Sequence, residues 1–133
     1  MNFRIILLVL ISILAFACGE DDNQGDATVL EGEWIWQFST GGIGGATLTP
    51  DTENYTNEIE FEGNSFESYR NDEIFSESEF SIIKSESIFT TDSVDIISYT
   101  NQSLIPQSFE LRSDTLILFD EVFDGFVHTY IKE

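Results

Sequence analysis

The sequence is poor in cysteine, histidine, proline and basic residues. It contains one cysteine, one histidine and two prolines, and its five lysines and arginines stand against 25 aspartates and glutamates. Because a disulfide needs two cysteines, no bridge can form within the chain. The formal net charge of −20 at pH 7 opposes direct binding to nucleic acid or to an anionic membrane surface. We therefore expect neutral, cationic or metallic partners.

The first residues, MNFRIILLVLISILAFAC, have the features of an export signal. Arg4 supplies a positive start, and Ile5 to Phe16 form an uncharged apolar run of twelve residues. At about 1.5 Å per residue, a helix of this length is shorter than the roughly 30 Å hydrocarbon core of a bilayer. We therefore expect residues 1–17 to be a cleaved signal peptide rather than a membrane span.

The single cysteine, Cys18, directly follows this run. A free thiol is a liability in an exported protein, so a lipid-modified N-terminal residue explains Cys18 better than a buried thiol in a cytosolic core. The segment AFAC resembles the cleavage site of bacterial lipoproteins, although it lacks the usual leucine three positions before the cysteine. The resemblance implies that Cys18 is acylated and anchors the protein to a lipid bilayer.

The segment after Cys18, GEDDNQGD, contains no apolar residue before Ala27. We expect residues 18–27 to form an acylated cysteine and a flexible acidic tether. Acids directly after the cysteine also resemble the surface-export signals of Bacteroidetes lipoproteins. That resemblance implies an exported outer-membrane lipoprotein on the periplasmic or cell-surface face. Residues 28–133 are about 105 residues long, enough for a single domain.

The body of the chain alternates apolar and polar residues and shows no sustained apolar repeat of 3.6. In the first run, one face is predicted to carry Leu30, Gly32, Trp34, Trp36 and Phe38. Gly63-Asn64, Asn71-Asp72 and Ser113-Asp114 each separate two runs by two residues, which is typical of tight hairpins. The expected strands are Leu30–Phe38, Tyr55–Glu62, Ser65–Arg70, Glu73–Ile83, Ser87–Thr91, Val94–Thr100, Gln107–Arg112, Thr115–Phe119 and Phe126–Lys132.

An open sheet of eight or nine strands would leave two exposed edges, which promote aggregation. We therefore predict an all-β fold, an up-and-down antiparallel, lipocalin-like β-barrel of about eight strands. Three segments resemble the small lipocalin-like lipoproteins of Bacteroidetes, a mostly uncharacterised family. They are LEGEWIWQFSTGGIGGATLTP, IEFEGNSFESYRND and DTLILFDEVFDGFVHTYIKE.

This resemblance implies a Gly-x-Trp motif in the first strand, here Gly32-Glu33-Trp34, with Trp34 closing the narrow end of the barrel. In lipocalins an arginine near the C-terminus packs over this tryptophan. The only late arginine, Arg112, lies two strand runs before the end of the chain rather than after the last strand, so the sequence departs from the family pattern here.

The glycine-rich segment GGIGG, residues 41–45, does not suit phosphate binding. A phosphate loop needs backbone N–H groups at a helix N-terminus and usually a lysine, whereas this segment runs into threonine, proline and acids. We expect a long mobile connection over the open mouth of the barrel, with Ile43 folding inward as a lid.

The lone histidine, His128, shares a predicted strand face with Phe126 and Tyr130. Zinc usually needs three or four ligands, and the acids of the preceding DEVFDG segment do not match a calcium loop, so we predict no metal and no cofactor. These acids are expected in an ordinary exposed turn. No serine lies in a nucleophile motif, so no catalytic residue is predicted.

Six glutamates are expected to form an acidic stripe across neighbouring strands: Glu58, Glu60, Glu62, Glu67, Glu77 and Glu79. The stripe either solvates the outer face or docks a basic protein.

Two functions remain open. In the first, the barrel encloses a small apolar molecule. In the second, the interior is packed solid and the acidic exterior binds a cationic protein or peptide. For the first function, the candidate ligand-binding residues are Trp36, Ile43, Phe61, Phe66, Tyr69, Phe80, Phe119, Phe126, His128 and Tyr130.

Overall fold

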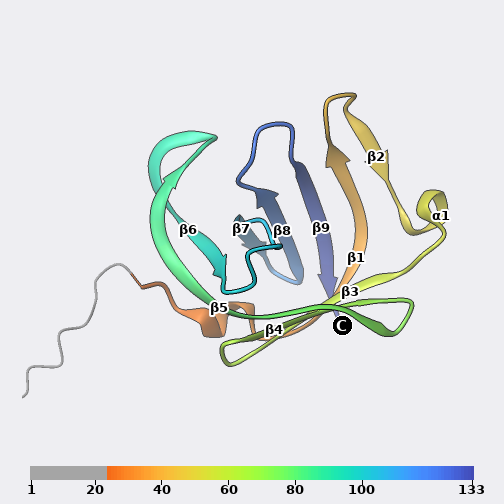
Figure 1. The fold of residues 1–133 in the computed structure, drawn as a ribbon, viewed down its shortest axis with the longest axis horizontal. Helices are drawn as coiled ribbons and strands as arrows, with labels where there is room; N and C mark the ends of the chain where they lie inside the picture. Colours follow the sequence, from red (N-terminus) through yellow and green to blue (C-terminus); the bar gives the residue numbers. More distant parts are fainter. Residues whose placement is uncertain (1–23) are drawn as a thin grey trace, which may run out of the picture.

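The computed structural model describes residues 24–133, which form one antiparallel sheet closed into a barrel (Figure 1). The elements are η2 (Ala27–Leu30), β1 (Gly32–Gly41), β2 (Ala46–Leu48), α1 (Pro50–Glu53), β3 (Asn57–Glu62), β4 (Ser65–Arg70), β5 (Glu73–Ser87), β6 (Thr90–Tyr99), β7 (Gln107–Arg112), β8 (Thr115–Asp120) and β9 (Phe126–Lys132). Strands β1 and β3–β9 pair in sequence order, and β9 pairs with β1. This closed eight-stranded barrel, with β2 added to β1, confirms the predicted fold class.

The tight turns predicted from dipeptides are confirmed. Gly63-Asn64 joins β3 to β4, Asn71-Asp72 joins β4 to β5, and Ser113-Asp114 joins β7 to β8. Gly63, Asn71, Asp72 and Ser113 adopt φ angles of 60°, 50°, 66° and 60°. These left-handed conformations suit hairpin turns of two residues.

The segments that follow β1 and β5 differ from the sequence expectation. The connection from β1 to β3 is long, as expected, but it contains a tight turn in which Gly41 pairs with Ala46, the short strand β2 and the helix α1. A side chain at Gly41 would place its Cβ 2.3 Å from the Gly125 carbonyl oxygen, so this close approach requires glycine. In addition, β5 continues to Ser87 and β6 begins at Thr90, so Ile88 and Phe89 form the turn.

The N-terminal part of the described chain packs on the barrel earlier than expected. Gln24 forms an isolated bridge with Ile83, and the Gly25 N–H donates to the Ile82 carbonyl at 2.9 Å. Asp26 caps η2 by accepting from the Thr28 N–H at 2.9 Å. The expected boundary at residue 28 therefore lies inside this contact region. The expected signal peptide 1–17 and Cys18 lie outside the described residues.

Trp34 is buried in contact with η2 and with the last strand. It is 1% exposed, and its indole Nε1–H donates to the Leu30 carbonyl at 2.8 Å. Lys132 lies over this tryptophan, with Nζ 5.1 Å from the ring centroid. Arg112 instead bonds Glu110 on the surface. The cation that packs on Trp34 is therefore Lys132 of the last strand rather than Arg112.

A β-bulge changes which residues of β1 face inward. In the pairing with β9, Trp36 lies opposite Tyr130 and Phe38 lies opposite Thr129, so Gln37 is the inserted residue. After the bulge Ser39 is 2% exposed, whereas Phe38 is 40% exposed. The prediction that Phe38 shares the inner face of Trp34 and Trp36 is therefore wrong.

Among residues 24–133, no helix is long and apolar enough to cross a bilayer. The α-helix α1 has four residues.

Candidate functional site

The barrel interior combines a packed core with a partly open cavity. Buried side chains, including Trp34, Phe61 and Phe80, form the packed core. Beside this core lies a partly open cavity of about 260 Å³. Its lining residues are Asn57, Ile59, Phe66, Ser68, Arg70, Phe75, Tyr99, Ser103, Leu104, Ile105, Gln107, Leu118, Asp120, His128 and Tyr130.

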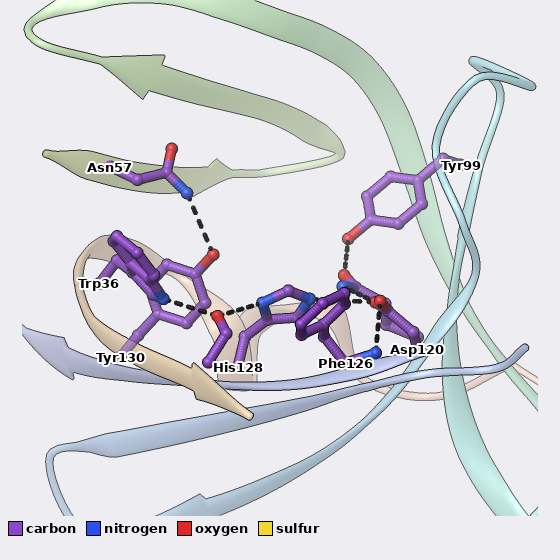
Figure 2. A network of polar contacts seen from close by, with 9 residues as sticks. Trp36, Asn57, Tyr99, Asp120, Phe126, His128 and Tyr130 are labelled. Carbon is purple, nitrogen blue, oxygen red and sulfur yellow. Dashed lines mark hydrogen bonds and ion pairs between the residues drawn. The ribbon is translucent and has the colours of Figure 1, made fainter. Parts of the chain in front are cut away.

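The cavity wall contains a network of polar contacts centred on Asp120 (Figure 2). The Asp120 side chain accepts from Gln107 Nε2 at 2.8 Å and from the Phe126 N–H at 3.1 Å. His128 Nε2 lies 3.2 Å from Asp120 Oδ1. Burial raises the pKa of Asp120, and the bonds from His128 and Gln107 more than offset this effect, so its pKa lies below the ordinary value.

The network continues from His128 to β1. Trp36 Nε1–H donates to Ser39 Oγ at 2.8 Å, and Ser39 Oγ lies 2.6 Å from His128 Nδ1 (Figure 2). Ionised Asp120 can only accept, so a neutral His128 carries its proton on Nε2, and its Nδ1 accepts from the Ser39 hydroxyl. Trp36 then donates to Ser39, Ser39 donates to His128, and His128 donates to Asp120. This chain of hydrogen bonds holds the imidazole in one orientation.

The grouping of Ser39, His128 and Asp120 contains the residue types of a hydrolytic triad, but its geometry does not suit nucleophilic attack. Ser39 is 2% exposed and is not among the cavity-lining residues. Its oxygen also accepts the Trp36 indole proton. A nucleophile needs access to the substrate, so this arrangement supports positioning of His128 rather than catalysis.

Two tyrosines border the network from opposite sides. Tyr99 OH donates to Gln107 Oε1 at 2.9 Å, and Tyr130 OH lies 3.4 Å from Asn57 Nδ2. Burial raises the pKa of both phenols, and the nearby Asp120 charge raises them further. Both phenols therefore stay neutral near pH 7.

Arg70 is the basic residue in the cavity wall, and its charge is not paired. Its guanidinium carbon lies 4.2 Å from the Tyr55 ring centroid and 3.9 Å from the Phe75 ring centroid. Its buried Nε has no hydrogen-bond partner, and none of the ion pairs within residues 24–133 includes Arg70. A second bulge brings Phe75 there, because Tyr69 pairs with Ile74 and Ser68 pairs with Ser76.

The predicted ligand-binding residues occupy three different environments. Phe66, His128 and Tyr130 line the cavity. Trp36, Phe61 and Phe80 are buried in the core, with Trp36 stacked on Tyr55 at 5.6 Å, and Phe126 stacks on His128 at 6.1 Å.

The other three predicted residues face outward. Tyr69 donates to Glu67 on the outer surface, Phe119 contacts the turn residue Phe89 at 6.4 Å between centroids, and Ile43 is 92% exposed. The expectation that Ile43 folds inward is therefore wrong. Tyr69 and Phe119 differ from expectation because the inward positions of their strands are the even-numbered ones, such as Phe66 and Leu118.

Sequence reasoning missed Arg70, Asp120 and Gln107. Strand alternation could have placed two of them on the inner face. Arg70 lies four residues after the inward-facing Phe66, and Asp120 lies two residues after the inward-facing Leu118. The expectation that Asp120 lies in an exposed turn is wrong, since this residue is 6% exposed.

Three glutamates of the predicted acidic stripe, Glu60, Glu67 and Glu77, form a row on the outer face together with Glu33, which was not predicted. The other predicted members, Glu58, Glu62 and Glu79, pair with Tyr69 or Ser65 and lie outside this row. Glu33 pairs with Glu60, Glu60 with Glu67, and Glu67 with Glu77 across four adjacent strands. A hydrogen bond with Glu133, and then repulsion from Glu133, Glu60 and Glu58, raises the pKa of Glu33. Hydrogen bonding to Glu67 raises the pKa of Tyr69 to about 12. Within residues 24–133, no three His, Cys, Asp or Glu side chains lie close enough to hold a metal ion.

In comparisons with known proteins, no family model, no curated protein and no solved structure matches this chain.

Proposed function

We propose that this protein is a membrane-anchored, lipocalin-like lipoprotein that holds a small, largely apolar molecule in its barrel. The single observation that carries this proposal is the cavity of about 260 Å³ between the packed core and solvent. Its walls combine apolar side chains with a few fixed polar groups, which is the usual composition of a small-molecule site. Polar groups in such a site orient the ligand, and apolar contacts supply most of its affinity.

The anchor is proposed from the sequence, where Cys18 follows an apolar run and precedes a polar segment. Acylation would hold the barrel at a bilayer despite the net charge of −20, because inserted acyl chains act independently of surface charge. Growth of the native host with an alkyne-labelled fatty acid tests this proposal. Labelling of wild type and its loss in Cys18→Ser supports acylation, whereas equal labelling of both proteins contradicts it.

Native mass spectrometry tests ligand binding directly. The full chain, purified from its cells without organic solvent, is weighed before and after denaturation. Loss of a small mass upon denaturation supports an occupied cavity, and fragmentation of that mass identifies the ligand class. A bare chain mass, together with unchanged tryptophan fluorescence on addition of fatty acids, haem and sterol-like probes, argues against the proposal.

A second candidate function is docking of a cationic protein or peptide. The observation that favours it is the row formed by Glu33, Glu60, Glu67 and Glu77, in which like charges lie opposite one another on adjacent strands. A cationic partner would relieve this repulsion. Its binding should weaken steeply between low and high salt, because exposed charges are screened.

A further inference from the structure

Arg70 lines the cavity, and no ion pair within residues 24–133 explains why a guanidinium lies there. It ends β4 and lies opposite Asn57 of β3 and Glu73 of β5. Arginine is rarely buried without an acceptor, because an unpaired buried donor loses its hydrogen bonds to water. Arg70 is half-buried and lines the cavity, and its Nε is buried without a partner.

The two aromatic contacts fix the guanidinium without using its donors. Tyr55 and Phe75 contact the guanidinium carbon at 4.2 and 3.9 Å from their centroids, which is within cation–π range. Ring contacts of this kind use the faces of the guanidinium, whereas its five N–H donors lie in the plane. The arrangement holds the group in place and leaves the N–H donors for an acceptor.

We propose that Arg70 binds the carboxylate of a small amphiphile whose apolar part lies in the barrel cavity against residues such as Phe66 and Leu118. This inference rests on the proposed ligand-binding function and specifies its ligand class. A carboxylate accepts two parallel N–H bonds from one guanidinium, which gives direction as well as affinity. The cavity volume of about 260 Å³ corresponds to roughly nine water molecules. It therefore fits a short acid better than a haem or a sterol.

The acid in the same cavity does not compete for this role. Asp120 already accepts from Gln107, His128 and the Phe126 N–H. These three bonds occupy most of the acceptor sites of this carboxylate, whereas the Arg70 guanidinium still has a buried Nε without a partner. The unpartnered hydrogen-bond donor in the cavity therefore favours an anionic ligand.

Octanoate and 1-octanol test this inference, since both are linear molecules with the same number of carbon atoms and they differ in the head group. Both are titrated calorimetrically into the full chain in detergent-free buffer. We expect octanoate to bind wild type about tenfold to a hundredfold more tightly than 1-octanol, the usual effect of charge-assisted hydrogen bonds. Arg70→Gln should abolish this preference without changing the affinity for 1-octanol.

Arg112→Gln is the matched control, because it removes the same charge from an exposed side chain outside the cavity. It should leave the preference for octanoate intact. Equal binding of both probes to wild type overturns the role of Arg70 but leaves a ligand-binding barrel. Absence of binding by both probes, with a bare chain mass in native mass spectrometry, overturns the proposed function itself. Because the comparison of probes uses wild type, the inference stays testable even if Arg70→Gln fails to fold.

Discussion

Lys132 lies opposite Trp34 across the β1–β9 pair, and its ammonium group sits 5.1 Å from the indole centroid while donating to the Glu31 carbonyl at 2.9 Å. The last strand thus covers this buried tryptophan. The contact joins the first strand to the last, which are the two strands whose pairing converts the sheet into a closed barrel.

Lys132→Ala should lower the free energy of unfolding by about 0.5–1 kcal/mol, the usual range for an exposed cation–π contact. Urea unfolding followed by tryptophan fluorescence measures this change. Lys132→Arg keeps the cation and should retain most of the stability. An equal loss in both variants would contradict the cation–π explanation.

Ser39→Ala should destabilise the barrel by about 1–3 kcal/mol, because the buried Trp36 indole N–H loses its acceptor. His128 Nδ1 also loses its contact with Ser39. Chemical unfolding measures the loss, and the imidazole resonances in NMR spectra report the change at His128. Ser85→Ala, at an exposed position of β5, is the control and should change stability little.

Asp120→Asn should reveal a pH-dependent contribution to stability. The folded pKa of Asp120 lies below its ordinary value, so its ionised form stabilises the fold above the unfolded pKa of about 3.9, and this contribution is lost as the pH falls through the folded pKa. At pH 7 the variant should be less stable than wild type by about 1–3 kcal/mol. The difference should shrink at pH 3. Urea titrations at both pH values measure it, and an equal difference at both would contradict the assigned role.

The barrel itself was accessible from sequence because its signals are local. Alternation identified most strands, and turns such as Gly63-Asn64 carry residues that tolerate the left-handed conformation. The turn at Ile88 and Phe89 was missed because both are exposed apolar residues, and neither is a residue type that is typical of turns. The three-residue strand β2 is too short to show a period.

The cavity was less accessible because it depends on two bulges. The insertion at Gln37 turns Ser39 inward toward Trp36 and His128, and the insertion at Phe75 brings its ring to Arg70. A bulge is defined by the partner strand, so a single strand's alternation does not reveal it. Strand alternation could place Arg70 and Asp120 on the inner face, whereas the contacts of Ser39 with His128 and of Phe75 with Arg70 became evident only in three dimensions.

Glu33→Gln should raise the thermal unfolding midpoint at pH 7. The folded pKa of Glu33 is raised by its hydrogen bond with Glu133 and by repulsion from Glu133, Glu60 and Glu58. A raised carboxyl pKa means that protonation favours the folded state, so this stability is present below the unfolded pKa and is lost as the pH rises through the folded pKa. At pH 7 the charged side chain is therefore unfavourable, and glutamine removes the repulsion.

Differential scanning calorimetry at low and high salt measures the effect of Glu33→Gln. Because exposed charges are screened, the gain in midpoint should be largest at low ionic strength and should shrink as salt is added. Glu86→Gln removes one charge from an exposed position opposite Ser93, outside the glutamate row, and should give a smaller gain. Equal gains from the two variants would show that total charge, rather than the facing glutamates, limits stability.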